Sequence, residues 1–297
     1  MNKRRSSWSP WITLAILISS GLFSLWQARP DGRFHLWVFD VGQGDAIFIQ
    51  TPDRHQILLD GGPDDRVLVE LGKHMPFWDR SIDLVILSHP HTDHLTGLID
   101  VARRYQIGQV WMSGALHTTP EFASWLAVLA DRHISNLPVW AGKTIDLDTA
   151  HLEVIYPLSD QTAVRPTNQH DATVVVKLTT ADDHAALLTG DLETEQEAKI
   201  VAADCPDQVR PCAKLHANLL KVPHHGSKTG LEPDFLAAIA PQDAIISCGQ
   251  RNPYGHPHAL TLERLVAAHI PIWRTDTEGT IEATLAQQGQ WRLTASR

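Results

Sequence analysis

The chain has 297 residues, of which 43% are hydrophobic and 20% are charged. This composition supports a large buried core and excludes an intrinsically disordered chain. The net charge of −9 does not favour broad, salt-driven attachment to nucleic acid, so a polyanionic substrate would need a local basic rim. The candidates for such a rim, which could equally be scattered surface charges, are Lys221, Lys228, Arg251 and Arg274.

The N-terminal segment differs from the rest of the chain. Three basic residues at positions 3 to 5 precede 23 uncharged residues, from 6 to 28, with Trp11 and Trp26 near the two ends. As a helix this segment would span about 35 Å, enough for one membrane crossing. A cleaved signal peptide is the alternative, with small residues at Ser19 to Gly21. Basic residues before an apolar span stay in the cytoplasm. Either hypothesis therefore predicts that residues 1–29 direct the rest of the chain, the body (residues 30–297), out of the cytoplasm.

Alternating strand and helix patterns follow in the body. Apolar, strand-like runs lie at 36–39, 46–50, 56–60, 82–88, 152–156, 174–178, 185–189, 219–222, 244–248 and 281–284. Amphipathic helical patterns lie at 64–73, 95–105, 120–132, 193–204, 233–239 and 260–269. No linker or low-complexity segment interrupts them. The pattern predicts an α/β domain whose sheet is buried by helices.

Four metal-binding side chains follow the strand expected at 82–88. His89 and His91 are two residues apart in extended backbone, so both rings point the same way and can bind one cation. Asp93 and His94, just beyond the turn into the next helix, can reach a second cation. This spacing predicts a dinuclear metal site.

Three cysteines are present. Cys205 and Cys212 enclose a polar loop and could form a disulfide in an exported domain, although the sequence leaves this open. Cys248 is expected to be a buried thiol on a strand.

Six short motifs extend the pattern in order along the chain. They are Phe39-Asp40-Val41-Gly42-Gln43-Gly44-Asp45-Ala46, Leu58-Leu59-Asp60-Gly61-Gly62, Ser88-His89-Pro90-His91-Thr92-Asp93-His94, Leu188-Thr189-Gly190-Asp191-Leu192-Glu193, Lys221-Val222-Pro223-His224-His225-Gly226-Ser227 and Asn252-Pro253-Tyr254-Gly255-His256-Pro257-His258. From about residue 34 to about 280 the chain resembles the C-terminal hydrolase domain of the ComEC family of DNA-uptake competence proteins. The resemblance implies the metallo-β-lactamase αββα sandwich, with two halves that meet near residues 160–170.

The resemblance also implies a ligand set. Asp191 would bridge the two metals, and one histidine of the pair 224–225 would complete the second. Because neighbouring side chains in extended backbone point to opposite sides, we expect His225 to be the ligand and His224 to contact the substrate or support the ligands. The family usually carries Asn-x-x-Ser where this chain has His170-Asp171-Ala172-Thr173. His170 could therefore complete a triad with His89 and His91, or be an exposed loop histidine.

Supporting roles are expected for further residues. Asp60 would orient the histidine loop, and Asp45 would lie beside the site. The candidate catalytic residues are Asp93 and His256. His256 and His258 could face the cleft, with His256 protonating a leaving group, or could simply lie at the start of a helix.

These expectations define a function. Two divalent ions, zinc or manganese, would activate a water for hydrolysis, and an aspartate bridge favours phosphoesters over β-lactams. The leading hypothesis is a phosphodiesterase or DNA nuclease related to competence and DNA uptake, acting on single-stranded DNA beside competence-system proteins. The alternatives are hydrolysis of a small phosphodiester, such as a phosphocholine or nucleotide, and a non-catalytic docking module.

Overall fold

The structure is a computed structural model that describes residues 10–27, 31–285 and 290–297. The chain divides into two compact units, residues 1–31 and residues 32–297. In the first unit, helix α1 spans Pro10–Gln27. Over the described residues, no helix has both the length and the apolar character that a membrane crossing requires. The basic residues at positions 3 to 5 lie outside the described residues.

The second unit contains two sheets. The first has eight strands in the order β15-β14-β1-β2-β3-β4-β5-β6. Their bounds are Arg292–Ala295, Ile281–Leu285, Phe34–Val38, Ile47–Gln50, Gln56–Leu59, Ser81–Ile86, Gln106–Met112 and Ser135–Pro138, in that spatial order. Strands β3 to β6 run parallel, whereas β15, β14, β1 and β2 pair antiparallel.

The second sheet has seven strands in the order β13-β12-β11-β10-β9-β8-β7. Their bounds are Ile272–Arg274, Asp243–Ile246, Leu219–Lys221, Ala185–Leu188, Val175–Thr180, Ala150–Tyr156 and Thr144–Leu147, in that spatial order. Strands β10 to β13 run parallel and β7 to β10 antiparallel.

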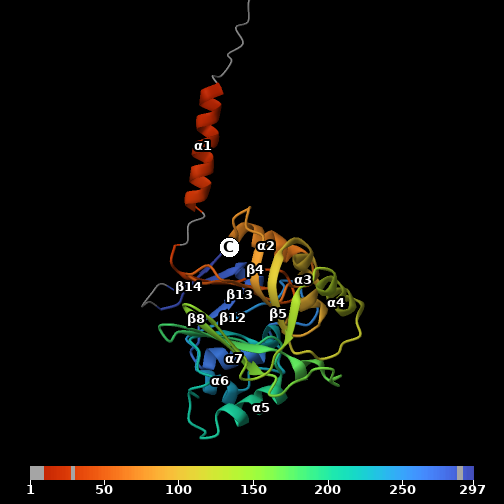
Figure 1. Cartoon of the computed structure of the whole chain (residues 1–297). Helices are drawn as coiled ribbons and strands as arrows, with labels where there is room; N and C mark the ends of the chain where they lie inside the picture. The colour runs from red at the N-terminus through yellow and green to blue at the C-terminus, as the bar shows by residue number, and fades with distance from the viewer. Residues whose placement is uncertain (1–9, 28–30, 286–289) are drawn as a thin grey trace, which may run out of the picture. The chain divides into compact units, whose positions relative to one another are not determined.

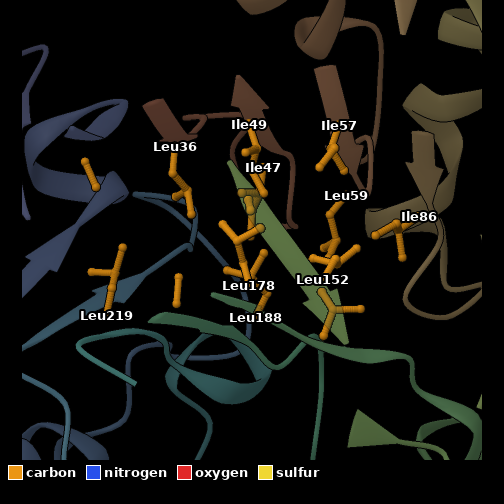
Figure 2. Packing of buried hydrophobic residues seen from close by; sticks show 14 of the residues in the cluster. Leu36, Ile47, Ile49, Ile57, Leu59, Ile86, Leu152, Leu178, Leu188 and Leu219 are labelled. Atoms are coloured by element: carbon orange, nitrogen blue, oxygen red, sulfur yellow. The ribbon is translucent and has the colours of Figure 1, made fainter. Parts of the chain in front are cut away.

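The central core lies between the two sheets. Figure 2 shows side chains of the first sheet, such as Ile47 and Leu59, facing those of the second, such as Leu152 and Leu178. These aliphatic side chains are fully buried or nearly so. Because successive side chains of a strand point to opposite faces, each sheet has a second apolar face that other elements must cover.

Helices cover both outer faces (Figure 1). Helices α2 (Arg66–His74), α3 (Thr92–Arg104) and α4 (Pro120–Asp131) pack on the first sheet through a second apolar cluster. Helices α5 (Thr194–Asp204), α6 (Pro233–Ile239) and α7 (Ala259–Ala267) pack on the second sheet through a third. The remaining short helices are α8 (Thr275–Glu278), η1 (Gln169–Ala172) and η2 (Pro223–Gly226). The result is the expected αββα sandwich.

One expectation about the organisation needs correction. The chain crosses from the first sheet to the second between Pro138 and Thr144, earlier than the region 160–170. It later returns to the first sheet, because β14 pairs with β1 from Phe34 to Val38. The disulfide left open by the sequence is present between Cys205 and Cys212, and Cys248 is a buried free thiol.

The topology brings the motifs together. Strands β3 and β4 are parallel neighbours, so the residues that follow them, Asp60 and Ser88, leave the first sheet at the same edge. Strands β10 and β11 are likewise parallel neighbours in the second sheet, and Asp191 and His224 follow them. Polar loops at the carboxyl ends of parallel strands are where α/β folds place their sites.

Candidate metal centre

The histidine loop connects β4 to α3. His91 is the N-cap residue of α3 and has an extended backbone. The His89 Nε2 and His91 Nδ1 atoms lie 2.9 Å apart. Two ring nitrogens that face each other at this distance can be ligands of a single cation.

Asp60 fixes this loop from beneath. Its carboxylate accepts hydrogen bonds from the Ser88 backbone N–H at 2.7 Å and from the Ser88 hydroxyl at 2.6 Å. It also lies 2.8 Å from Nδ1 of His94. With Nδ1 held in this way, Nε2 of His94 is free to face the site. Asp60 therefore occupies the orienting position that the sequence predicted.

Asp191 lies at the centre of the site. Its Oδ2 atom is 3.3 Å from His94 Nε2, 3.5 Å from His225 Nε2 and 3.8 Å from His89 Nε2. The preceding Gly190 has φ +51°, and a Cβ there would approach Ser88 within 3.0 Å. Glycine at this position thus allows the two strand ends to meet closely.

Two groups of possible ligands share Asp191. In each group one ligand atom per residue lies within 4.8 Å of the others. The first group comprises His89, His91, His170 and Asp191, and the second comprises Asp93, His94, Asp191 and His225. The sequence predicted all seven residues, and the fold brings them to one place.

The His224–His225 pair differs from its expected geometry. The segment is not extended: His224 and His225 have left-handed backbones, with φ of 46° and 54°. The prediction that the two side chains point to opposite sides of an extended backbone was therefore wrong in its reason. The two rings nevertheless have different neighbours. His225 joins the second group, whereas His224 lies 3.5 Å from the Glu193 carboxylate.

Three further contacts escaped the sequence analysis. His170, Glu193 and His224 form another possible ligand group beside the first two. Glu193 is held by the Thr229 hydroxyl at 3.0 Å. The Nδ1 atom of His225 lies 2.9 Å from the backbone oxygen of Ser247, which directs Nε2 to the site. The sequence feature that could have indicated Glu193 is its position two residues after Asp191.

Lys221 is not a rim residue. Its side chain is 1% exposed, forms an ion pair with Asp45 and donates a hydrogen bond to the Gly190 carbonyl at 3.1 Å. Arg274 pairs with Asp276 at 2.7 Å. Of the four candidates, Lys228 and Arg251 are exposed. The rim is therefore smaller than the sequence suggested.

The electrostatics of the site fit a cation. Burial lowers the pKa of His89 well below its usual value and that of His91 to about 4, so both rings are neutral ligands at pH 7. Despite burial, the neighbouring histidines hold the pKa of Asp191 well below its usual range. Despite its own burial, His225 has a pKa raised to about 9, chiefly by Asp191 and Asp45. Asp191 and Asp45 thus place buried negative charge beside His225.

Unpartnered buried atoms provide a test of fit for divalent metal ions. Among the described residues, His94 Nε2, His225 Nε2 and Asp191 Oδ1 are buried without a hydrogen-bond partner. Leaving such atoms unpaired is costly unless another group binds them. They belong to the donor types that zinc and manganese use. The residues present therefore fit two metal ions.

The last motif lies beside the second group. The ring centroid of His256 is 6.2 Å from that of His225 and 5.8 Å from that of His224. Burial and then His225 lower the pKa of His256 to about 4, so the ring is neutral at pH 7. His258 is the N-cap of α7, where its Nδ1 accepts a hydrogen bond from Leu260 at 3.2 Å. The structure thus gives His258 the helix-start role, which was the alternative.

Known proteins share this architecture. The model of the metallo-beta-lactamase superfamily matches residues 39–250. ComE operon protein 3 of Bacillus subtilis is 28% identical over 262 residues, which cover 82% of this chain and 32% of that protein. Competence protein ComA of Neisseria gonorrhoeae is 27% identical over 282 residues, 94% of this chain and 36% of that protein. The chain thus spans about a third of the length of these relatives.

A solved structure shows the same fold. The metallo-beta-lactamase fold protein YhfI of Bacillus subtilis superimposes with a TM-score of 0.52 at 12% identity, covering 84% of this chain and 99% of that one. The fold, the family match and the His/Asp groups agree. The chain belongs to the metallo-beta-lactamase superfamily and is a metal-dependent hydrolase with competence-related homologues.

Proposed function

We propose that the protein is a phosphodiesterase that cleaves single-stranded DNA at a centre of two divalent ions, zinc or manganese. The observation that carries the proposal is the pair of ligand groups that share Asp191. Two ions bound there would lower the pKa of a bound water and neutralise charge on the phosphate. The similarity to competence proteins supports DNA as the substrate and competence-system proteins as partners.

The protein's own residues supply orientation. Asp60 and Ser247 direct Nε2 of His94 and His225 toward the centre. Lys221 compensates the buried charge of Asp45. His256, neutral at pH 7, can donate one N–H to a phosphate oxygen. Proton donation to a leaving group, which the sequence suggested for that ring, stays a prediction.

The direct test is hydrolysis of single-stranded DNA by the purified protein with added zinc or manganese. Asp191→Ala should abolish cleavage while leaving the circular dichroism spectrum unchanged, since the apolar core does not include Asp191. Unchanged turnover in that variant would remove Asp191 from the centre.

Hydrolysis of a small phosphodiester is the second candidate. It is favoured by the net charge of −9 and by the small basic rim, which give a long polyanion little attraction. A panel that includes a nucleotide phosphodiester and a phosphocholine ester distinguishes the two. Hydrolysis of these esters without any DNA cleavage would favour this second candidate.

We also infer that the body is attached to the membrane and exported. The support is the uncharged segment 6–28, which is longer than α1, with basic residues before it. The disulfide adds to this, because disulfides persist in oxidising compartments. Alkaline phosphatase fused after Arg297 should be active, because it works only outside the cytoplasm. Activity only of a cytoplasmic reporter would contradict export.

A further inference from the structure

An exposed aromatic side chain lies beside the metal centre without a role in it. Tyr254 is 67% exposed. Its ring stacks on that of His256, with centroids 5.7 Å apart and an interplanar angle of 26°. His256 in turn lies 6.2 Å from His225, a possible ligand of the second group. A continuous series of rings thus connects the centre to the surface.

The loop that carries Tyr254 is held by one amide side chain. Asn252 Oδ1 accepts hydrogen bonds from the backbone N–H groups of Tyr254 at 3.2 Å and His256 at 2.9 Å. Its Nδ2 donates to the carbonyls of Gly249 at 2.8 Å and His256 at 2.7 Å. A loop whose backbone is already fixed loses little conformational entropy when a ligand stacks on its ring.

Exposed apolar side chains also occur in the loops next to His117, whose ring neighbours the first group. Leu116 is 41% and Val164 is 42% exposed. Their loops are joined by a backbone hydrogen bond of 2.7 Å. The adjacent His117 ring lies 6.3 Å from His91, a possible ligand of the first group. Exposed apolar side chains therefore lie next to a histidine that neighbours the first group.

The charges around the centre favour stacking over phosphate contacts. Lys221 is buried and Arg274 is paired, so few cations remain to bind a phosphate backbone. Single-strand binding proteins combine such contacts with aromatic rings, because every base has a flat π face. A quaternary ammonium, by contrast, typically binds in a cage of several rings, whereas the ring stacked on Tyr254 is that of His256.

We propose that Tyr254 is a base-stacking platform, which binds one base of a single-stranded nucleic acid while the neighbouring phosphodiester lies at Asp191. This inference rests on the proposed function and deepens it. It also explains how an acidic protein could hold a polyanion with weak dependence on salt.

The test compares Tyr254→Ala with Tyr254→Phe, which keeps the ring and is the matched control. Each is assayed on a single-stranded oligonucleotide, a fully abasic strand of the same length and bis(p-nitrophenyl) phosphate. Tyr254→Ala should raise the KM for the oligonucleotide roughly 5- to 100-fold, the usual effect of losing one stacked base. Tyr254→Phe should stay near wild type. Neither variant should change kcat for any of the three substrates or the KM for the abasic strand, which has no base to stack.

Each contrary result has a separate meaning. A wild-type protein that cleaves the oligonucleotide, with the same KM in Tyr254→Ala, would overturn the stacking role and leave the proposed function intact. Equal losses on all three substrates would overturn it too, since the residue would then be structural. If wild type hydrolysed p-nitrophenyl phosphocholine but no DNA, the proposed nuclease activity would fail, and the stacking inference with it.

Discussion

Asp60 determines how the site is built at the scale of single residues. Its backbone has a positive φ of 59°, and its side chain is fully buried. The buried carboxylate makes three contacts, two with Ser88 and one with His94. The sequence Asp-Gly-Gly could have been an ordinary turn. The parallel pairing of β3 with β4 places Asp60 beneath the histidine loop instead.

Removing Asp60 should weaken metal binding without removing a ligand. We expect Asp60→Ala to lower zinc or manganese affinity about 10- to 100-fold, the usual effect of losing a residue that orients a ligand. Competition with a chromogenic chelator measures this. Asp100→Ala, which removes a half-exposed carboxylate of α3 paired with Arg103, is the control. Equal affinities in the two variants would show that Asp60 does not orient His94.

Glu197 is a buried acid outside the metal centre. Burial raises its pKa to about 7, although its carboxylate accepts hydrogen bonds from the backbone N–H groups of Leu231 and Glu232. The pKa of Glu197 is thus higher in the folded protein than the value of 4.5 expected for the unfolded chain. Its contribution to stability is therefore fully present below pH 4.5 and is lost as the pH rises through about 7.

Stability should therefore fall at alkaline pH because of Glu197. From pH 6 to pH 8 the free energy of unfolding should lose about 1 kcal/mol through this group. Urea denaturation at both pH values should show this loss in wild type and in Glu195→Gln, an exposed neighbour on α5. It should be absent in Glu197→Gln. The same pH dependence in all three proteins would refute the assignment.

The sequence predicted which residues come together in the possible ligand groups better than it predicted their backbone. Histidine and aspartate spacing was sufficient for His89, His91 and Asp93, because the residues are close in sequence. It was insufficient for the turn at His224 and His225, since left-handed backbone at non-glycine residues is imposed by the surrounding structure. The burial of Lys221 also depends on a distant partner, Asp45.

At the scale of elements, the strongly apolar strands and the amphipathic helices of the body were predicted close to their observed bounds. The strands that were missed are β5, β6, β7, β13 and β15. They are short, partly exposed or polar: all four residues of β6 are exposed or half-exposed. Such strands form because a neighbouring strand offers hydrogen bonds, and no apolar pattern in the sequence marks them.

The disulfide constrains the connection between α5 and β11. Cys205 ends α5, and its bond to Cys212 closes a short loop before β11. Closing a loop of this size should contribute about 2 to 3 kcal/mol to the free energy of unfolding. Urea denaturation with and without dithiothreitol should show that loss. The Cys205→Ser/Cys212→Ser variant should not respond to the reductant. Identical midpoints for oxidised and reduced wild type would contradict the prediction.

At the scale of the whole molecule, net charge limits how DNA could bind. With a net charge of −9, binding should depend on few phosphate contacts. Lys228→Ala/Arg251→Ala should lower the slope of log affinity against log salt by about two, one unit per contact. Arg103→Ala/Lys199→Ala removes the same charge from α3 and α5 and should leave the slope unchanged. Equal changes in both double variants would indicate a general effect of charge.

The division into two sheets was predicted, but the crossing point was not. The expected boundary near residues 160–170 ignored the return of β14 and β15 to the first sheet. That return pairs residues about 250 positions apart, such as Phe34 with Leu285. A single sequence carries no local signal for such a pairing.

The metal content of the protein tests the central claim most directly. Protein purified without chelator should contain two divalent ions per chain by inductively coupled plasma mass spectrometry, because the two ligand groups share Asp191. The Asp191→Ala variant should lose most of this metal while remaining folded. A wild-type protein that is folded, free of metal and still hydrolytically active would contradict the account.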